Sequence, residues 1–169
     1  AFLAIGCGAS TAPLNPAYRA EEFAFYLTDL RAKALVILHG MASDAREVAG
    51  RLSIPVLDLV PGEAAGAFTL EGGEPGNAEK PGMAWPEDEA LVLHTSGTTA
   101  RPKIVPLTQA NICASARNIG RTLELAPDDA CLNIMPLFHI HGLMAAVLAS
   151  VAAGGAVVCT PGFDALRFF

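Results

Sequence analysis

The sequence predicts an α/β fold in which parallel sheet layers are flanked by helices. Composition supports this first: 52% of the 169 residues are hydrophobic and only 17% are charged, as expected for deeply buried parallel strands. A strand, a helix and a second strand then follow one another between residues 34 and 60, which is the pattern of a βαβ unit. Strands and helices alternate again between residues 87 and 169, which predicts a second region of similar kind.

The first subregion, residues 1–60, is expected to hold the βαβ unit. Asn15 is a favourable N-cap and Pro16 suits the first helical position, so a helix is expected to begin there. Apolar residues at helical spacing give this helix one apolar face: Ala20, Phe23, Leu27 and Leu30. A strand at 34–38, a helix at 43–52 capped by Ser43 or Asp44, and a strand at 54–60 complete the unit.

Residues 61–86 are rich in Gly, Pro, Glu and Ala and show no periodicity, so a surface linker is expected there. The second subregion, residues 87–169, is expected to open with strands at 89–95 and 103–106. Thr108 is a natural N-cap for the next helix, whose apolar stripe consists of Ile112, Ala116, Ile119 and Leu123. The remaining elements are expected to be a strand at 130–136, a loop at 137–143, an apolar helix and a strand at 156–160.

Charge and cysteine content argue against several classes of protein. The net charge of -6 disfavours a nucleic-acid binder, which would carry a basic face. The four cysteines form no C-x-x-C pair, so neither a zinc knuckle nor a redox motif is expected. Scattered, reduced cysteines suit the cytoplasm, and the first residues lack the basic stretch of a secretory signal.

One apolar run has the composition of a membrane span. It extends from Leu143 to Cys159 and falls slightly short of the roughly 18–20 residues that cross a bilayer. The pair Gly154-Gly155 divides it into a helix-length piece and a strand-length piece. A buried helix, a glycine stop and a core strand are therefore expected, and no transmembrane segment.

A loop rich in hydroxyl groups, TSGTTARPK, runs from Thr95 to Lys103 between two of the expected strands. Gly97 lets the backbone approach a ligand closely, and Lys103 adds a compact positive charge that can meet phosphates. The hydroxyl groups come from Thr95, Ser96, Thr98 and Thr99. No Walker pattern is present, because no glycine precedes the lysine. On composition alone, a phosphate-binding loop and an ordinary surface loop both remain open.

The order of these residues resembles the signature loop of the adenylate-forming superfamily, which includes acyl-CoA synthetases, peptide-synthetase adenylation domains and luciferases. The family pattern is Thr/Ser-Ser-Gly-Ser/Thr-Thr-Gly-x-Pro-Lys-Gly. The sequence departs from it at Ala100 and Ile104, where the family usually has glycine, so the loop is expected to differ in detail. The segment that begins with PLNP at Pro13 also resembles the family. The combination looks closest to the 4-coumarate and oxalate–CoA ligases.

A second motif, MPLFHIHGL at residues 135–143, resembles the family's next core motif. His139 falls on the position of a histidine or aromatic residue that borders the acyl pocket, and the resemblance implies that it is catalytic. His141 and Gly142 are expected to take part in substrate binding, with Gly142 allowing close approach. The alternative is a polar turn before an apolar helix. A metal site at the His-x-His pair is not expected, because no third ligand is evident.

The resemblance implies a ligase that joins an acid to coenzyme A and forms AMP. A small carboxylic acid attacks the α-phosphorus of ATP and gives an acyl-adenylate and pyrophosphate, and the thiol of coenzyme A then displaces AMP. Magnesium is expected to neutralise the pyrophosphate charge. The residues implied in holding the pyrophosphate portion are Thr95, Ser96, Gly97, Thr98, Thr99 and Lys103.

Three later motifs of the family are not found: Tyr-Gly-x-Thr-Glu, whose Glu serves magnesium, an Asp for the ribose, and a C-terminal Lys for adenylation. The chain is therefore expected to be an incomplete part of the family's large N-terminal domain, to need the remainder of a parent polypeptide as its partner, and to be inactive alone. The alternative is a non-catalytic nucleotide-binding or scaffolding module. An α/β-hydrolase is disfavoured because Gly-x-Ser-x-Gly is absent.

Overall fold

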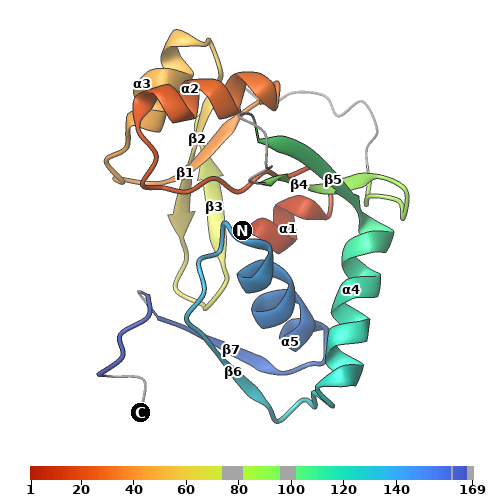
Figure 1. Cartoon of the computed structure of the whole chain (residues 1–169). Helices are drawn as coiled ribbons and strands as arrows, with labels where there is room; N and C mark the ends of the chain where they lie inside the picture. Colours follow the sequence, from red (N-terminus) through yellow and green to blue (C-terminus); the bar gives the residue numbers. More distant parts are fainter. Residues whose placement is uncertain (74–81, 96–101, 161, 167–169) are drawn as a thin grey trace. The chain divides into compact units, whose positions relative to one another are not determined.

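The computed structural model describes residues 1–73, 82–95, 102–160 and 162–166. The chain divides into two compact units (Figure 1). One unit consists of residue 1 and residues 14–81, and the other of residues 2–13 and 82–169. The N-terminal segment 2–13 thus belongs with the second unit, although the sequence grouped it with the first subregion.

The first unit combines a three-stranded sheet with helices. Its elements are α2 (Ala20–Asp29), β1 (Leu35–Leu38), α3 (Asp44–Arg51), β2 (Val56–Pro61) and β3 (Phe68–Glu71). The strands lie in the order β1-β2-β3, with β1 parallel to β2 and β3 antiparallel to β2. Because α3 connects the two parallel strands, the expected βαβ unit is confirmed.

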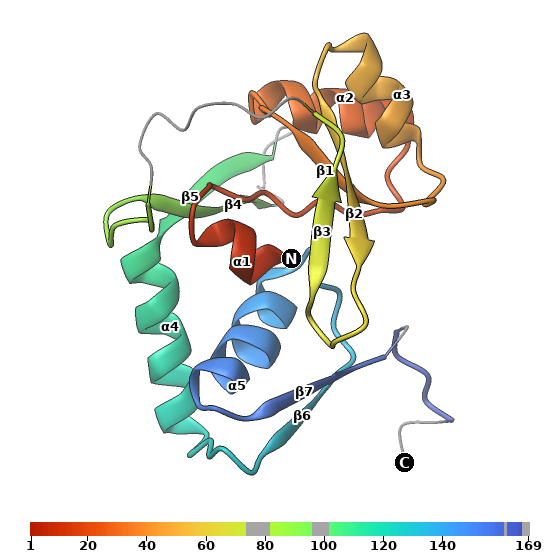
Figure 2. The same cartoon turned by 180° about the vertical axis from the view of Figure 1, so that it is seen from behind.

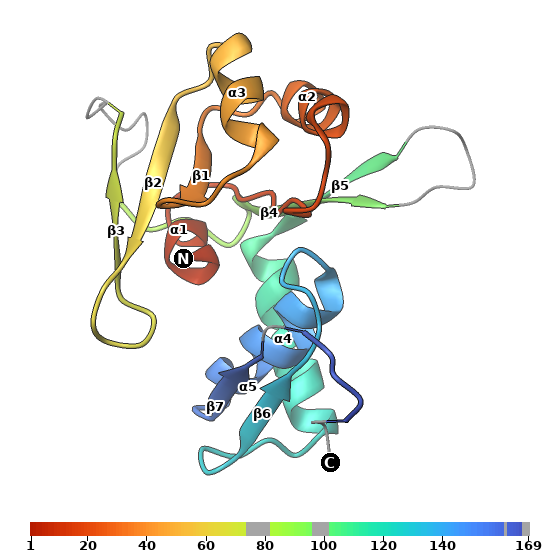
Figure 3. The ribbon, with the colours of Figure 1, turned by 90° about the vertical axis from the view of Figure 1, so that its left-hand side faces the viewer.

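The core of the first unit lies where α2 and α3 pack together. Phe23 and Leu27 of α2 join Ala45 and Val48 of α3 in one cluster of almost fully buried side chains. Leu35 of β1 packs against this cluster, and Figure 3 shows both helices beside β1 and β2. Each large side chain buried in this way contributes about 1.5–3 kcal/mol to folding.

The helix α2 begins later than expected. The Oδ1 atom of Asn15 accepts a hydrogen bond from the Ala17 N–H at 3.0 Å and so stabilises a turn. The helix is instead capped one turn later, where the Glu22 carboxylate accepts from the Arg19 N–H at 2.9 Å. The expected start at Pro16 is therefore wrong, because an Asn side chain stabilises turns as readily as helix N-termini.

Part of the expected linker is a strand. β3 lies within residues 61–86 and pairs with β2 from Asp58↔Glu71 to Pro61↔Phe68. A strand of this length is too short to show a clear alternation between the glycines and prolines that surround it. The pairing with β2, which the sequence does not reveal, is what gives these residues a regular structure.

Two helix starts agree with the sequence. The Oγ atom of Ser43 accepts from the Ala45 N–H at 3.2 Å and caps α3. In the second unit, Thr108 Oγ1 accepts from the Asn111 N–H at 3.2 Å, and Asn111 Oδ1 accepts from the Thr108 N–H at 3.0 Å. These side chains satisfy backbone N–H groups that have no partner inside a helix.

The second unit combines two-stranded sheets with helices. Its elements are α1 (Phe2–Gly6), β4 (Glu89–Thr95), β5 (Lys103–Thr108), α4 (Gln109–Thr122), β6 (Ala130–Asn133), η1 (His141–Leu148), α5 (Ala149–Ala152) and β7 (Ala156–Cys159). β4 and β5 form an antiparallel hairpin, whereas β6 and β7 are parallel. The helices α4 and α5 lie side by side in both Figure 1 and Figure 2.

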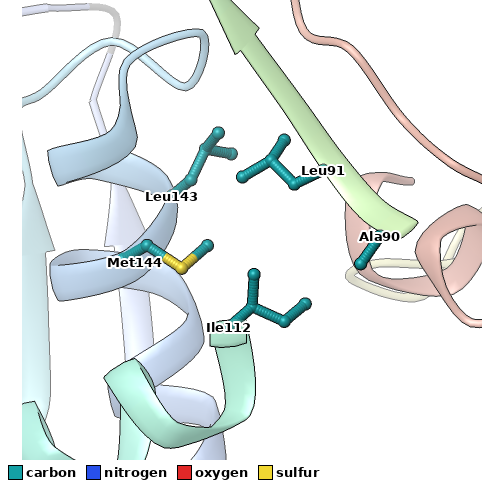
Figure 4. Close-up of a cluster of buried hydrophobic side chains, with 5 residues drawn as sticks. All are labelled: Ala90, Leu91, Ile112, Leu143 and Met144. Carbon is teal, nitrogen blue, oxygen red and sulfur yellow. The ribbon is translucent and has the colours of Figure 1, made fainter. Parts of the chain in front are cut away.

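A single buried cluster connects the hairpin to the helices of the second unit. It contains Ala90 and Leu91 of β4, Ile112 of α4, and Leu143 and Met144 of η1 (Figure 4). The side chains of Leu91 and Leu143, both buried, point toward each other in this view. The first half of β4 is therefore held firmly against the start of η1.

The apolar run 143–159 divides as the sequence predicts, into helix, glycine stop and strand. η1 and α5 are followed by a break at Gly154, whose φ of 84° is left-handed. The Gly155 N–H donates to the Ser150 carbonyl at 2.9 Å and closes the helix end. Within the described ranges, no helix has both the length and the apolar character that crossing a bilayer requires.

Candidate phosphate and acyl site

The segment from Thr95 to Lys103 joins the two strands of the β4–β5 hairpin. Thr95 ends β4, Lys103 begins β5, and the two residues are register partners across the antiparallel ladder. Residues directly opposite each other in such a ladder point to the same face, with Cβ atoms roughly 4.5–5.5 Å apart. The side chains of Thr95 and Lys103 thus leave the hairpin on the same face. The expected ligands Ser96, Gly97, Thr98 and Thr99 lie outside the described residues.

The hairpin is anchored in the core at one end and exposed at the other. Ala90 of β4 is buried, whereas Thr95 and Lys103 are exposed. Thr11 secures the other edge of β4, because its N–H donates to the Ala90 carbonyl at 3.0 Å and its carbonyl accepts from the Val92 N–H at 2.8 Å. Figure 3 shows the two strands running side by side away from α4. Lys103 is therefore accessible to solvent yet rooted in a fixed strand.

This end of the hairpin has the chemistry to bind an anion. The Lys103 ammonium is a compact charge with three donors, and the Thr95 hydroxyl can donate beside it. A hydrogen bond to a charged group is worth about 1.5–3 kcal/mol. Two such donors on one face fit the oxygens of a phosphate group.

The MPLFHIHGL segment forms a tight turn that leads into η1. The turn at residues 137–138 brings the His139 N–H to the Pro136 carbonyl at 3.2 Å, and the His139 carbonyl accepts from the Leu143 N–H at 3.1 Å. The His139 ring also contacts the first residue of η1, because its Nδ1 accepts from the His141 N–H at 3.3 Å. A backbone N–H can only donate, so this bond requires an Nδ1 without a proton, and a neutral ring that makes it carries its proton on Nε2.

The three residues expected at the acyl site differ in their exposure to solvent. His139 and His141 are exposed, whereas Gly142 is buried. A Cβ atom at Gly142 would lie 2.6 Å from the Pro136 carbonyl oxygen and 3.2 Å from that of Met135. The close approach expected at Gly142 is thus an approach to the chain's own carbonyls. Because η1 begins at His141, the expected loop over 137–143 is shorter than predicted.

The helix η1 has π geometry, a rare form that is frequently found at functional sites. Its wider turns are visible in the hydrogen bond from the Ala149 N–H to the Met144 carbonyl, five residues back. The irregular helix follows directly on the exposed pair His139 and His141. Backbone irregularity and exposed titratable side chains therefore coincide in this segment.

Asn133 is a candidate positioning residue that the sequence analysis missed. Its side chain is only 4% exposed. Its Nδ2 donates to the Met135 carbonyl and its Oδ1 accepts from the Met135 N–H, each at 3.1 Å. This arrangement ends β6 at Asn133 and not at Pro136 as expected. The available signal was the Asn itself, since Asn side chains commonly bond to the backbone two residues on.

A charged cluster stabilises the first unit. The Arg46 guanidinium donates to the Asp58 carboxylate at 2.5 Å, to the Leu38 carbonyl at 3.1 Å and to the Met41 carbonyl at 3.2 Å. The Nδ1 atom of His39 lies 3.7 Å from the same carboxylate. The hydrogen bond from Arg46 holds the pKa of Asp58 below its ordinary value. Arg46 thus ties α3 to both parallel strands.

Tyr18, also in the first unit, has a perturbed phenol. Burial raises its pKa to about 12, and a hydrogen bond with Tyr26 acts in the same direction. The two rings stack with centroids 4.9 Å apart and planes 11° apart. Tyr18 therefore acts as a packing residue, in contact with Phe23 and Tyr26.

The described part of the chain offers little to a metal ion. No group of three or more His, Cys, Asp or Glu side chains within these ranges could hold one. Magnesium prefers carboxylate and phosphate oxygens, whereas the paired residues at the hairpin end are a threonine and a lysine. The residues present therefore do not fit a magnesium site, and no magnesium ligand is assigned among them.

Comparison with known proteins establishes the family. The sequence profile of the AMP-binding enzyme family matches residues 1–169. The chain belongs to the AMP-binding enzyme family. The likeness inferred from residues 95–103 and 135–143 is thereby confirmed, and the mixed α/β fold agrees with it.

Within the AMP-binding enzyme family, the curated relatives of this chain include acid–CoA ligases. Oxalate–CoA ligase of Arabidopsis thaliana is 42% identical over 160 residues, which are 92% of this chain and 31% of that protein. Among solved structures, ATP-bound MatB from Rhodopseudomonas palustris has a TM-score of 0.74 and 28% identity, covering 96% of this chain and 32% of that one.

A ternary product complex of a malonyl-CoA ligase, with methylmalonyl-CoA and AMP bound, is also similar to this chain. Its TM-score is 0.76 at 25% identity, and the match covers 97% of this chain and 32% of that one. The chain therefore spans about a third of the length of the relatives it matches. Two of these relatives are ligases by name. The MatB structure contains ATP, and the malonyl-CoA ligase structure contains methylmalonyl-CoA and AMP.

Proposed function

We propose that this chain forms the phosphate-binding part of an ATP-dependent acid–CoA ligase. The observation that supports it most is the pairing of Thr95 with Lys103 at the exposed end of a core-anchored hairpin, within a chain of the AMP-binding family. A hydroxyl and an ammonium on one face are the donors that a pyrophosphate group requires. Ser96, Gly97, Thr98 and Thr99 are proposed to complete this grip.

In the proposed reaction, Lys103 and Thr95 hold the β- and γ-phosphates of ATP. A carboxylate oxygen of the acid attacks the α-phosphorus, the bond from that phosphorus to the bridging oxygen breaks, and pyrophosphate leaves with the electron pair. Negative charge grows on the leaving group, so the Lys103 ammonium stabilises the transition state more than bound ATP. The thiol of coenzyme A, losing its proton, then attacks the acyl carbonyl and AMP departs.

His139 is proposed as the residue that meets the acid. Its Nε2–H faces away from the bond that Nδ1 makes to His141, so it can donate to a carboxylate or acyl oxygen. His141 is proposed to line the same surface, and Gly142 to allow the turn that carries both. The relatives' names, oxalate–CoA ligase and malonyl-CoA ligase, support a small dicarboxylic acid as the substrate.

The proposed function also implies a magnesium ion, a partner and a cellular compartment. The metal would arrive with the phosphates of ATP, and its protein ligands are proposed to lie outside the described residues. The rest of a parent polypeptide is the proposed partner, since relatives are about three times longer. The cytoplasm is the proposed compartment, supported by the free state of all four cysteines.

Exchange of labelled pyrophosphate into ATP tests this function. The parent polypeptide is expected to exchange only when a suitable small acid is present, and the 169-residue chain alone is expected not to exchange. Robust acid-dependent exchange by the chain alone would refute its assignment as one part of the site. A parent that binds ATP but exchanges with no small carboxylic acid would favour a non-catalytic nucleotide-binding module.

A further inference from the structure

We infer that Asn133 is a positioning residue that fixes the tautomer and orientation of the His139 imidazole. The inference deepens the proposed function and rests on it, because only that function gives His139 an acid to contact. Asn133 itself would touch neither the acid nor the nucleotide. It acts through the short turn that separates β6 from η1.

The first step is the fixed position of Asn133. Both polar atoms of its buried side chain bond to Met135, at 3.1 Å each. Its own carbonyl accepts from the N–H and from the hydroxyl of Thr160, each at 3.3 Å. Asn133 is thus held on one side by the segment after β7 and holds the turn on the other. A buried amide whose nitrogen and oxygen are both hydrogen-bonded specifies one conformation of its surroundings.

The second step leads from Met135 to the histidine. Met135 is followed by Pro136, whose carbonyl accepts the His139 N–H at 3.2 Å. Gly142 lets the helix approach this carbonyl, because any Cβ there would lie 2.6 Å from the oxygen. The position of Pro136 therefore sets both the backbone of His139 and the start of η1.

The third step is the ring itself. When the His139 backbone and the start of η1 hold these positions, the His141 N–H donates to Nδ1 of His139 at 3.3 Å. This bond excludes a proton from Nδ1 and places it on Nε2. The exposed edge of the ring is then a hydrogen-bond donor, which suits a carboxylate or acyl oxygen. If the turn moved, the ring would lose this bond and both neutral tautomers would be populated.

Nitrogen-15 NMR of the imidazole rings tests the inference directly, since long-range proton–nitrogen couplings distinguish the two tautomers. At a pH where the rings are neutral, His139 of the 169-residue chain is expected to show the Nε2–H form, assigned by comparison with His139→Gln. Asn133→Ala is expected to shift His139 toward a mixture of tautomers. Asn118→Ala, which alters an exposed Asn on α4, is expected to leave it unchanged.

Two outcomes would overturn the inference. One is an Nδ1–H tautomer in the unmodified chain, and the other is an unchanged Nε2–H signal in folded Asn133→Ala. If Asn133→Ala does not fold, Asn133→Asp replaces it. That variant keeps the acceptor for the Met135 N–H but loses the donor to the Met135 carbonyl, so the same shift toward a mixture is expected and an unchanged signal again refutes the inference.

Pyrophosphate exchange by the parent polypeptide separates this inference from the proposed function. Asn133→Ala is expected to lower kcat roughly 10–100-fold while the KM for ATP stays the same, because the acid and not the nucleotide is misplaced. A parent without any exchange would refute the proposed function alone. A parent whose exchange is insensitive to Asn133→Ala would refute the positioning role and leave the ligase intact.

Discussion

Replacing Gly142 by alanine is expected to destabilise the chain, whereas the same change at Gly120 is expected to stabilise it. Both glycines lie in helices, Gly142 in η1 and Gly120 in α4. In a helix, alanine is favoured over glycine by about 0.8–1.0 kcal/mol. A Cβ atom at Gly120 would meet nothing within 4 Å, so this gain is expected nearly in full.

The destabilisation expected for Gly142→Ala comes from a clash with backbone atoms. The new Cβ would lie 2.6 Å from the Pro136 carbonyl oxygen and 3.2 Å from the Met135 carbonyl oxygen. Both are backbone atoms, so they cannot rotate away as a side chain could. Overpacking of this kind costs about 1–3 kcal/mol. The helix preference is common to both sites, so the two variants are expected to differ by that same 1–3 kcal/mol.

Thermal unfolding followed by far-ultraviolet circular dichroism measures this difference. For a chain of this size 1 kcal/mol corresponds to about 2–4 °C, so Gly142→Ala is expected to melt roughly 2–12 °C below Gly120→Ala. Equal melting temperatures would contradict a clash at Gly142. They would mean that the Met135–Pro136 turn moves aside freely and does not set the position of η1.

Other variants test separate contacts. Lys103→Met is expected to weaken pyrophosphate binding by roughly 10–100-fold, because a charge-assisted bond is lost, while Lys33→Met, in the first unit, leaves the calorimetric affinity unchanged. Asp58 has a pKa lowered by its arginine partner, so its contribution to stability is present above its unfolded pKa and is lost as pH falls through the folded value. Asp58→Asn is expected to flatten that acid limb in urea titrations, and an unaltered limb would contradict the pairing. Leu132 and Val158 are register partners, 46% and 53% exposed. Replacing both with Lys is expected to reduce the fluorescence of an apolar dye, and unchanged fluorescence would contradict an exposed apolar face.

Local signals in the sequence predicted the elements that depend on local chemistry. Ser43 and Thr108 cap helices as expected, because each side chain meets an N–H group two or three residues away. The helix start predicted from Asn15 was wrong for the same reason, because the short Asn side chain stabilises a turn as well as a helix N-terminus. β3 was missed because its order comes from pairing with β2, across the chain, and not from its own pattern.

The site shows the same division between local and long-range information. The order of residues from Thr95 to Lys103 predicted a phosphate-binding loop between two strands, and the structure adds that these two residues lie opposite each other. Gly142 was expected to face a ligand, but its neighbours are the carbonyls of Met135 and Pro136. This contact, like the clamp that Asn133 forms, depends on how the turn folds back, which spacing alone does not show.

Titration of inorganic pyrophosphate into the nitrogen-15-labelled chain tests the central claim most directly. We expect shifts of the backbone amides of Thr95 and Lys103, weakened by added salt as expected for exposed charges and lost in Lys103→Met. Amides of the first unit, such as those of α3, are expected to stay in place. Saturable shifts confined to the first unit, or shifts at the hairpin that survive Lys103→Met, would contradict the claim that this hairpin end binds the phosphates.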